Sequence, residues 1–454
     1  MHQILTLILA VLSISMTDLA ARAVPAEALA IRSTGENVAG GWRLDANGYI
    51  GAYLKVETSG EITIRVKASG DASGEVNPQM LVSISDQHQL NEVSRDSRAY
   101  ESTFDLVPGT YLVRVALVND TPGQDLALVI ESVEVEGAAL IEENTDALAL
   151  AAADTYIQTG RRGNVRIHLP GVEAGTDVRA RLTRLDFNLG ANVPGTSNIY
   201  ITEDAEPGSM PYEFQKHFLE SFNATVPSNA GKWAYNEAER DVVTMGYVDT
   251  ILGYAEEHDL WMRMHTLIWN TEQQPDWVHE LIGKAQQGDA DAKAQLREEI
   301  TERIGYYVRD RAKRFDAIDV LNEVHHQPVY LEIFGVEGIA DIYRETAEAI
   351  REGGGEAQTF INEFNILQWS RRPPYVTEPD PYANWYREHA EELQHHGAQL
   401  DAIGVQYYAN ADPTIGSNKH SAARIAQVLH NLSITGLPIA LTEFGVSRGA
   451  EPED

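Results

Sequence analysis

The sequence predicts an all-β sandwich followed by a parallel α/β barrel. From about Ala30 to Gly137, short runs rich in Val, Ile, Leu and Tyr are separated by Gly, Pro, Asn and Asp turn signals. From Arg184 onward, apolar strands alternate with amphipathic helical segments, an order typical of a parallel sheet covered by helices. The chain has 454 residues, which exceeds the roughly 250 that a single barrel needs and leaves room for the first domain.

Residues 1–23 have the features of a secretory signal peptide. The segment 4–14 is apolar but too short to span a bilayer, and Ala21-Arg22-Ala23 is a small-x-small cleavage site. Because the amino-terminal end is only weakly basic, an uncleaved anchor is the alternative interpretation. No other segment is long and apolar enough to cross a membrane, so we expect a secreted or periplasmic protein.

The composition limits the partners of the protein. Its formal net charge of −33 argues against nucleic acid and anionic membrane surfaces as partners. This charge is compatible with a protein that acts on a neutral polymer. The chain has no Cys, which rules out disulfides, Cys-based metal sites and a Cys nucleophile.

The first domain, residues 30–137, contains regularly spaced β-patterned runs. The predicted strands are 49–57, 61–68, 80–85, 100–106, 110–118 and 126–136. Apolar and polar residues alternate in 61–67 and 111–115, as expected of strands with one buried face. Short strands of this kind predict an antiparallel sandwich. The Pro-Gly-Thr-Tyr strand followed by Val118-Asn119-Asp120 resembles the β-sandwich carbohydrate-binding modules.

Two groups of residues are candidates for ligand binding in this domain. Three aromatic side chains are of the kind that stacks on sugar rings, although core aromatics are the commoner case: Trp42, Tyr49 and Tyr53. Three oxygen-bearing side chains are candidate Ca²⁺ ligands, although such clusters are more often only turns: Asn119, Asp120 and Asp125.

Residues 138–153 are rich in Ala, Glu and Asp, which indicates a linker or a short helix. The second domain is predicted to occupy 154–454. It opens with a predicted strand pair, 162–169 and 176–183, joined by Pro170-Gly171.

Seven strands and six helices alternate in the rest of the second domain. The predicted strands are 186–193, 222–226, 260–268, 318–321, 358–361, 402–405 and 439–441. The predicted helices are 212–221, 240–258, 292–314, 338–352, 382–396 and 422–432. This is the β/α order of an eightfold barrel, in which active sites lie at the carboxyl ends of the strands.

Two of these buried strands end in a glutamate. The run 317–321, aliphatic except for Asp319, leads into Asn322-Glu323, and the apolar run 437–441 leads into Thr442-Glu443. An unpaired charge buried at such a position costs several kcal/mol in order of magnitude, so each carboxylate must be paired, hydrogen-bonded or functional. A single such glutamate is often only an ion-pair partner. Two strand-end carboxylates are the arrangement used for glycoside hydrolysis, with one as acid/base and the other as nucleophile or base.

Six motifs in register carry a resemblance to a known family. They are 222–233 (Phe-Asn to Lys-Trp), 263–270 (Arg-Met-His to Trp-Asn), 319–323 (Asp-Val-Leu-Asn-Glu), 362–365 (Asn-Glu-Phe-Asn), 404–406 (Gly-Val-Gln) and 442–443 (Thr-Glu). The second domain resembles glycoside hydrolase family 10, the endo-β-1,4-xylanases. The resemblance implies a TIM (β/α)8-type barrel, a retaining mechanism, xylan or a related plant-type polysaccharide as substrate, and no cofactor.

The resemblance also implies roles for individual residues. Glu323 would be the general acid/base and Glu443 the nucleophile, while Asn322 would bond the sugar 2-hydroxyl. Further residues would hold sugars near the cleavage point: His265, Lys232, Asn229 and Gln406, with Trp269 as an apolar wall. Physical chemistry agrees, because the acid must stay protonated near neutral pH and the nucleophile must be ionised.

The chain departs from the family beside the nucleophile and in its length. The family has a His at position 408 that bonds the nucleophile and an acid at position 445 that supports it, whereas this chain has Tyr408 and Gly445. Our hypothesis is that the Tyr408 hydroxyl bonds Glu443 directly. Only eleven residues follow Glu443, so we expect a barrel that lacks its last strand and helices, and a chain that is a fragment of a longer protein.

Three alternatives to a xylanase remain at this point. Ala230, where the family usually has a Glu, and Tyr408 leave room for a related barrel hydrolase that acts on a β-glucan or a mixed-linkage polymer. A non-catalytic polysaccharide-binding protein is the second, although the presence of both Glu323 and Glu443 argues against it. A metal-dependent hydrolase is the least favoured, because the pairs His325-His326 and His395-His396 lack the i, i+4 spacing of helical zinc sites.

Overall fold

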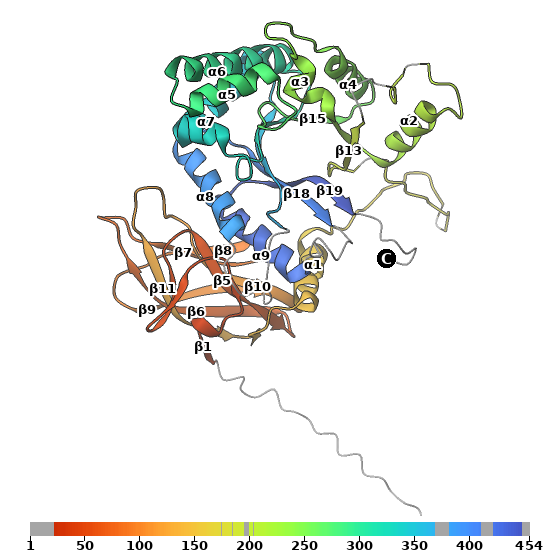
Figure 1. The fold of residues 1–454 in the computed structure, drawn as a ribbon. Helices are drawn as coiled ribbons and strands as arrows, with labels where there is room; N and C mark the ends of the chain where they lie inside the picture. The colour runs from red at the N-terminus through yellow and green to blue at the C-terminus, as the bar shows by residue number, and fades with distance from the viewer. Residues whose placement is uncertain are drawn as a thin grey trace, which may run out of the picture. The chain divides into compact units, whose positions relative to one another are not determined.

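A computed structural model describes residues 22–446 except 174, 184, 195–198, 203, 368–380 and 410–420. The chain divides into two compact units, Met1–Asp120 with Gln124–Arg162, and Thr121–Gly123 with Gly163–Asp454 (Figure 1). Residues 1–21 of the predicted signal peptide lie outside the described residues. No helix in the described ranges combines the length and the apolar character that crossing a membrane requires.

The first unit is a sandwich of two antiparallel sheets. One sheet has the order β3-β4-β11-β6-β9, with β1 paired to β11; the other has the order β12-β5-β10-β7-β8, with β2 paired to β5. The strands of the first sheet are β1 (Ala23–Pro25), β3 (Glu36–Val38), β4 (Gly41–Leu44), β6 (Gly60–Asp71), β9 (Arg98–Leu106) and β11 (Ala127–Glu136). The strands of the second are β2 (Ile31–Arg32), β5 (Gly48–Val56), β7 (Gln79–Ile84), β8 (Gln87–Glu92), β10 (Gly109–Leu117) and β12 (Ala139–Ile141). The six predicted strands are confirmed, and the sandwich prediction with them.

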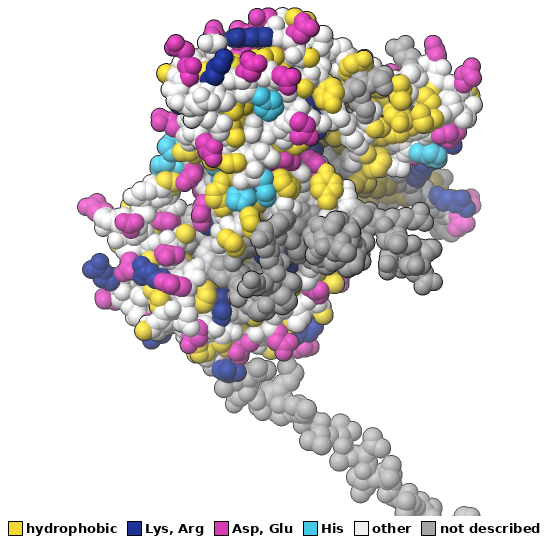
Figure 2. Space-filling model, in the orientation of Figure 1, with side chains coloured by type: hydrophobic (Ala, Val, Ile, Leu, Met, Phe, Trp, Pro, Cys, Tyr) yellow, Lys and Arg dark blue, Asp and Glu magenta, His cyan; other side chains and the backbone are white. Residues whose placement is uncertain are grey.

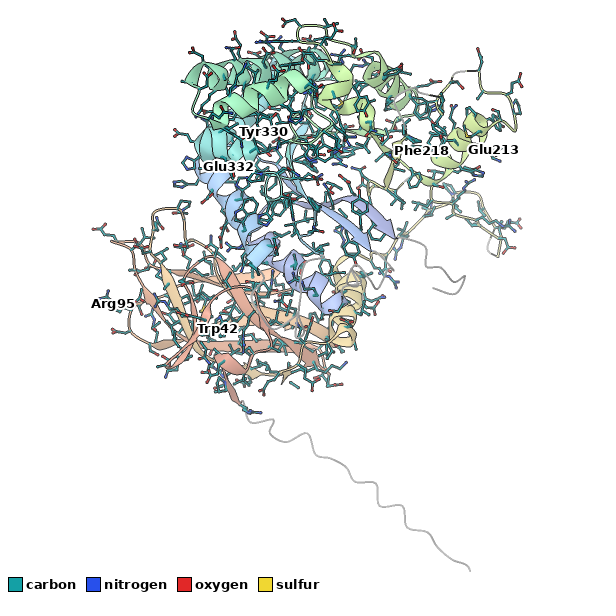
Figure 3. All side chains as sticks on the ribbon, in the orientation of Figure 1. Trp42, Arg95, Glu213, Phe218, Tyr330 and Glu332 are labelled. Carbon is teal, nitrogen blue, oxygen red and sulfur yellow. The ribbon has the colours of Figure 1, made fainter. Side chains whose placement is uncertain are left out.

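The three aromatic candidates for sugar stacking belong to the sandwich interior. Trp42, Tyr49 and Tyr53 expose only 6%, 0% and 2% of their surface. Figure 3 labels Trp42 among the strands of the sandwich. The Trp42 indole also donates a hydrogen bond of 2.9 Å to the Thr34 carbonyl, which satisfies its buried N–H. These side chains therefore stabilise the fold, and the core interpretation is confirmed.

The segment 138–153, which we predicted to be a linker or a short helix, is folded into the first unit and includes the start of a helix, so the helix alternative is correct and the linker alternative is wrong. Strand β12 pairs with β5, with Ala139 opposite Lys55. Helix α1 (Asp146–Gly160) begins after Thr145, whose hydroxyl caps it, and Thr155 accepts a hydrogen bond from the Thr110 amide in β10. Alanine-rich composition favours a helix as readily as a linker, and here the helix covers a sheet.

The predicted strand pair 162–169 and 176–183 is also wrong. The described residues of this stretch form no strand, and Val165 and Leu182 expose 85% and 72% of their surface. A two-stranded ribbon is marginal in water unless one of its faces packs against something. The alternation of apolar and polar residues in 162–183 was therefore not enough to predict a strand pair.

The second unit is built on a parallel sheet with the order β13-β14-β15-β16-β17-β18-β19. The strands are β13 (Gly190–Val193), β14 (Ala224–Pro227), β15 (Trp261–Met264), β16 (Ala317–Asn322), β17 (Gln358–Glu363), β18 (Ala402–Ala409) and β19 (Ile439–Val446). All seven strands of the predicted β/α alternation are confirmed. In the described part of the chain, β13 and β19 are the two edges of the sheet, which agrees with a barrel that lacks its last strand.

Helices connect these strands and cover the sheet, and in Figure 1 α5 to α8 lie along its outer side. They are α2 (Met210–Ser221), α3 (Trp233–Asn236), α4 (Gly246–Glu257), α5 (Asp276–Gln286), α6 (Ala290–Arg303), α7 (Val329–Glu352), α8 (Pro381–His395) and α9 (Ala422–Leu432). The six predicted helices are present, whereas α3 and α5 were not predicted. The predicted helix 292–314 ends as an α-helix at Arg303 and continues as π- and 3₁₀-helical turns to Arg311.

Two surface features lie away from the carboxyl ends of the strands. Hydrophobic side chains gather around α2, where Met210, Tyr212 and Leu219 are exposed (Figure 2). A cavity of about 450 Å³ near the starts of β13, β14 and β15 is lined by Leu189, Asn223 and other residues. Because barrel active sites lie at the opposite ends of the strands, we looked for the site there.

Candidate active site

The two glutamates singled out from the sequence lie at the carboxyl end of β16 and in the carboxyl-terminal half of β19. Glu323 comes directly after β16, in a left-handed backbone conformation with φ of 59°. Glu443 lies in β19, opposite Gln406 of β18 in the parallel register. The backbone N–H of Glu323 donates to the Asn362 carbonyl of β17 at 2.8 Å, which fixes the point where the chain leaves the sheet.

Glu323 is held by two hydrogen-bond donors, one from the segment that follows β15 and one from β18. The Trp269 indole N–H donates to Oε2 at 2.7 Å, and the Gln406 amide donates to Oε1 at 2.9 Å. Burial raises the pKa of Glu323; the hydrogen bonds from Gln406 and Trp269 oppose this rise, and the charges of Glu363 and Glu443 add to it. The result is a carboxyl group that keeps its proton at a higher pH than an exposed glutamate does.

Glu443 has different partners. The Asn362 amide donates to its Oε1 at 3.3 Å, and the Tyr408 hydroxyl donates to its Oε2. Burial, together with the charge of Glu443 and the hydrogen bond to it, raises the pKa of Tyr408, so this hydroxyl remains a proton donor. The direct bond from Tyr408 to Glu443 that we hypothesised from the sequence is present in the structure.

Gly445 makes room for Tyr408. The two residues lie opposite each other in the register of β18 and β19. A Cβ atom at position 445 would lie 2.8 Å from Cδ1 of Tyr408, closer than side chains tolerate. Tyrosine at 408 and glycine at 445 therefore depend on each other, as the paired departure in the sequence suggested.

Asn322 and Asn362 link the two glutamates. The Asn362 amide donates to Oδ1 of Asn322 at 2.9 Å as well as to Glu443, and its own Oδ1 accepts from the Thr442 hydroxyl. Asn322 is buried, and its Nδ2 finds no acceptor among the described residues. A buried amide N–H without a partner is costly, so this donor is well placed for a ligand oxygen.

His265 is fixed by a buried ion pair at the end of β15. Its Nδ1 lies 2.7 Å from the Asp319 carboxylate, which also contacts the Arg263 guanidinium. Burial by itself would raise the pKa of Asp319, but Arg263 and His265 outweigh burial and hold it below the usual value. Arg263 further donates to the Thr442 carbonyl at 2.8 Å, which ties β15 to the strand that carries Glu443.

Lys232 and Asn229 follow β14 and share Gln273 as a partner. Lys232 Nζ donates to the side-chain Oε1 of Gln273 at 2.6 Å and lies 4.5 Å from the centre of the Trp269 ring. The Gln273 amide donates to Asn229 at 3.2 Å. Burial lowers the pKa of Lys232, and the charges of Glu443, Glu323 and Glu272 oppose this. The amine is thus close enough to both catalytic candidates to feel their charge.

Direct contacts therefore bring the predicted site residues together from β14, β15, β16, β18 and β19. Two participants were not singled out from the sequence, Asn362 and Gln273. Asn362 belongs to the motif 362–365, but no role was predicted for it. A polar side chain near the end of a buried strand must be hydrogen-bonded or functional, and this could have identified it. Nothing in the sequence around Gln273 distinguishes it from an ordinary loop residue.

The comparison with known families agrees with this geometry. The family model described as Glycosyl hydrolase family 10 matches residues 197–453, more than half of the 454-residue chain. The chain belongs to glycosyl hydrolase family 10. Glu323, Glu443 and the residues that hydrogen-bond to them all lie within the matched range.

The relatives of this family 10 chain are distant. It is 27% identical to endo-1,4-beta-xylanase 1 of Arabidopsis thaliana over 291 residues, which is 63% of this chain and 27% of that protein. It is 24% identical to endo-1,4-beta-xylanase 2 of Aureobasidium pullulans over 233 residues, which is 50% of this chain and 59% of that protein. The chain thus spans about a quarter to three fifths of the length of these two curated relatives. Among solved structures, a family 10 protein from Paenibacillus barcinonensis is 20% identical with a TM-score of 0.45, covering 59% of this chain and 72% of that chain.

The first unit matches a second family model. Residues 63–149 match the model described as Ca-dependent carbohydrate-binding module, xylan-binding. In the loop after β10, Asn119 accepts from the Gln79 amide at 2.7 Å and donates to the Asn77 carbonyl at 3.0 Å, so it braces β7. The carboxylate of Asp120 accepts from the Leu126 amide at 3.4 Å, and Asp125 is exposed.

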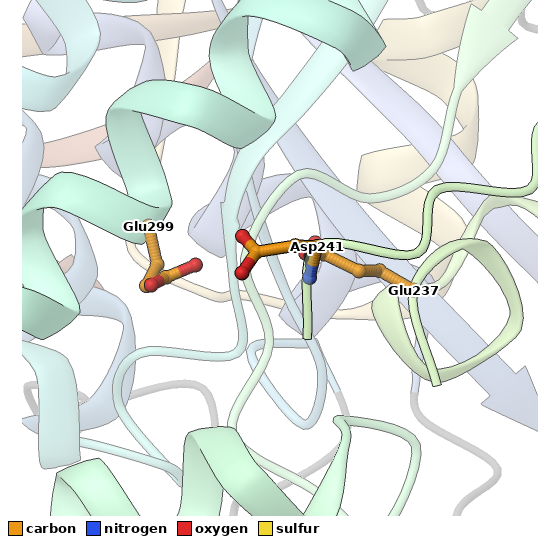
Figure 4. A group of neighbouring side chains, drawn as sticks. All are labelled: Glu237, Asp241 and Glu299. Carbon is orange, nitrogen blue, oxygen red and sulfur yellow. Dashed lines mark hydrogen bonds between the residues drawn. The ribbon is translucent and has the colours of Figure 1, made fainter. Parts of the chain in front are cut away.

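Another group of acidic residues lies in the second unit, outside the site just described. Glu237, Asp241 and Glu299 each place an oxygen within 4.8 Å of the others (Figure 4). Glu237 accepts from the Asp241 amide at 3.0 Å and from the Trp233 indole at 3.0 Å, and Glu299 accepts from Arg240 at 2.7 Å. These bonds join the loop after α3 to α6, which gives the group a structural role.

Proposed function

We propose that this protein is a secreted, retaining endo-β-1,4-xylanase that cleaves the xylan backbone with two glutamates. The observation that carries the proposal is the contrast between Glu323, whose pKa is raised by burial, and Glu443, which accepts hydrogen bonds from Asn362 and Tyr408. Two carboxyl groups kept in different protonation states are what acid-assisted displacement at a sugar requires. The curated relatives carry the name endo-1,4-beta-xylanase, which favours xylan as the substrate.

In the first step, Glu323 donates its proton to the glycosidic oxygen as the bond to the leaving sugar breaks. Glu443 attacks the anomeric carbon and forms a covalent glycosyl-enzyme, which consumes its negative charge. The hydrogen bonds from Tyr408 and Asn362 hold Glu443 in one orientation for this attack. Gln406 can turn its amide, so that its carbonyl oxygen accepts a hydrogen bond from protonated Glu323 or its NH2 group donates one to the carboxylate, whereas the Trp269 indole can only donate.

In the second step, Glu323 acts as a base. With Glu443 esterified, one of the charges that favours the proton on Glu323 has disappeared, so Glu323 can activate water at the same anomeric carbon. The buried amide of Asn322 would donate to the sugar 2-hydroxyl, a bond that strengthens in the transition state. Lys232, His265 and Asn229 would bind hydroxyls of the sugars on either side.

The sandwich would bind the same polymer and bring the barrel to it, with Ca²⁺ as part of its site. Carboxylate and amide oxygens are the ligands that Ca²⁺ prefers. The residues present fit such an ion, because Asp120 and Asp125 flank Gln124, whose buried Oε1 finds no donor among the described residues. We assign Ca²⁺ to these three side chains, while Asn119 positions the loop. The ion would supply charge that attracts sugar hydroxyls.

Cleavage of a signal peptide after Ala23 would deliver the enzyme to its polymer outside the cell. Ala23 is the first residue of β1 and pairs with Glu134. Removal of the residues up to and including Ala23 would leave Val24 and Pro25 in place on the sheet. Amino-terminal sequencing of the exported protein tests this proposal, which an intact amino terminus at Met1 would contradict.

The test of the enzyme function is reducing-sugar release from xylan and from a mixed-linkage β-glucan by this chain and by Glu443→Ala. Circular dichroism verifies that both proteins are folded. We expect release from xylan that Glu443→Ala abolishes. Release from β-glucan alone would make the protein a glucan hydrolase, and a folded chain that binds xylan but cleaves neither polymer would make it a binding protein.

A further inference from the structure

The turn that follows Glu323 is held by the carboxylate of Glu363, which has no role in the proposed reaction steps. Glu363, the last residue of β17, is fully buried. Its Oε2 accepts from the backbone N–H of His325 at 2.7 Å, and its Oε1 contacts Nδ1 of His326 at 2.8 Å and accepts from the Phe364 amide at 2.9 Å. One carboxylate therefore fixes both residues that come two and three positions after the general acid.

The same turn closes back on Glu323 itself. The Glu323 carbonyl accepts from the amides of His326 and Gln327 at 3.1 and 2.7 Å. Glu323 has a positive φ, a conformation that costs a residue other than glycine free energy and persists only where its surroundings enforce it. The end of β17 holds Glu323 in this backbone conformation through two residues. The Asn362 carbonyl accepts a hydrogen bond from the Glu323 amide, and the Glu363 carboxylate holds the turn at His325 and His326.

Asn362 and Glu363 contact different groups, because the side chains of neighbouring residues in a strand point to opposite faces of the sheet. Asn362 contacts Asn322 and Glu443 on the catalytic side. Glu363 contacts the turn instead, so it reaches neither Glu443 nor the amide of Asn322 in any hydrogen bond that we find among the described residues. Its effect on the reaction must therefore pass through Glu323.

We propose that Glu363, together with the His326 ring, is a positioning residue that holds the general acid Glu323 in place for proton donation to the leaving group. This inference rests on the proposed function. The titratable groups that face Glu363 are the His326 ring on the turn, Glu323 itself, and Tyr386 of α8, which is buried and feels the charge of Glu363. The charge of Glu363 also contributes to the raised pKa of Glu323, which agrees with a role at the acid.

The test uses the dependence of the rate on the leaving group. Proton donation matters for an aryl β-xylobioside with a poor leaving group such as phenol, and hardly matters for one with 2,4-dinitrophenol, which departs as an anion. For Glu363→Gln in the full chain, we expect kcat/KM to fall about tenfold or more with the phenyl substrate and less than about threefold with the dinitrophenyl substrate. The high-pH limb of the phenyl profile should move to lower pH, because the charge that favours the proton on Glu323 is gone.

Two further variants make the result decisive. His326→Phe keeps the ring contact with Phe364, whose centroid lies 3.9 Å away, but removes the donor, and it should give the same pattern more weakly. If Glu363→Gln does not fold, this variant decides. Glu332→Gln in α7 makes the same chemical change at an exposed position and should leave both substrates unaffected. Equal losses with both substrates would overturn the positioning role, while a wild type that cleaves neither would overturn the proposed function instead.

Discussion

Glu323 and Glu443 have identical side chains, and their neighbours make them different. Glu323 lies against the Trp269 indole and Gln406 and is largely removed from water. Glu443 accepts from Asn362 and Tyr408. Each environment suits one role in a double displacement, and each can be probed with a single substitution.

Glu323→Gln should stabilise the folded protein at neutral pH. A carboxyl whose pKa is raised on folding contributes stability below its unfolded pKa of about 4.3 and loses that contribution as the pH rises through its folded pKa. The neutral amide avoids the loss, so the variant should gain stability at pH 7 and little at pH 4. Urea unfolding at both pH values measures this. A gain of the same size at pH 4 and pH 7 would contradict the raised pKa.

Tyr408→Phe should weaken catalysis without unfolding the protein. It removes the hydroxyl that donates to Glu443 and keeps the ring, which is about half exposed. Hydrogen bonds to charged groups contribute about 1.5–3 kcal/mol, so kcat/KM on xylooligosaccharides should fall roughly tenfold or more. An unchanged rate would show that this hydroxyl does not orient the nucleophile.

At the level of secondary-structure elements, the carboxyl ends of neighbouring strands depend on each other. The Tyr408 and Gly445 pair joins β18 to β19, and Arg263 joins β15 to β19 through the Thr442 carbonyl. Such cross-strand ties set the positions of the catalytic groups to within the tolerance that the reaction allows.

The Tyr408 and Gly445 pair should behave non-additively. Gly445→Asp alone places a Cβ 2.8 Å from Tyr408 Cδ1, which should displace the ring and reduce activity about as much as Tyr408→Phe does. Adding Tyr408→His replaces the ring with a smaller one that can turn away from the new side chain, and it restores a donor supported by an acid. The double variant should therefore be more active than Gly445→Asp, as kcat/KM measurements on a xylooligosaccharide would reveal. A double variant that is weaker than both single variants would argue against the coupling.

Arg263→Met should strongly destabilise the barrel. It leaves Asp319 buried with the His265 ring as its remaining side-chain partner, and breaking a buried pair in this way costs about 3–5 kcal/mol. Because Arg263 helps to hold the pKa of Asp319 low, wild-type Asp319 contributes stability above its unfolded pKa of about 3.9 and loses it as the pH falls further. The difference in unfolding free energy between the two proteins should therefore narrow in acid. A difference below about 1 kcal/mol at pH 7 would mean that the pair contributes little.

The elements that the sequence predicted best are those with continuous or alternating apolar residues. The inner barrel strands β14 to β18 fall in this class, because they are largely buried on both faces. The edge strands β13 and β19 are more exposed, with Leu441 and Phe444 of β19 open to solvent. Strand β8 was missed because its residues Gln87–Glu92 are mostly polar and most of them are exposed. The segment 162–183 was predicted as strands from the same kind of pattern, but no neighbouring strand pairs with it.

The candidate site was predictable where a polar residue interrupts a buried strand. Glu323, Glu443 and Gln406 were found in this way and through family motifs. Gln273 was not, since its importance comes from contacts with Lys232 and Asn229 across a loop. The support that Glu363 gives to the turn after Glu323 likewise depends on distances that no single sequence contains.

At the level of the whole molecule, two units with separate hydrophobic cores would act on one polymer. If the sandwich binds xylan through Ca²⁺ while the barrel needs no metal, the two activities should respond differently to a chelator. EDTA should release the full chain from insoluble xylan and leave hydrolysis of a short soluble xylooligosaccharide unchanged. Binding assays in EDTA with and without added Ca²⁺ measure the first effect. Retained binding in EDTA, or a loss of hydrolysis that Ca²⁺ restores, would contradict this division.

The central claim is that Glu323 and Glu443 carry out a double displacement on β-1,4-linked xylose. Proton NMR during hydrolysis of a xylooligosaccharide by the full chain tests it most directly, because the anomeric signal of the first product reports the stereochemistry. The β-anomer should appear first and only later equilibrate with the α-anomer. Early appearance of the α-anomer would mean inversion by a single displacement, and would contradict the role of Glu443 as nucleophile.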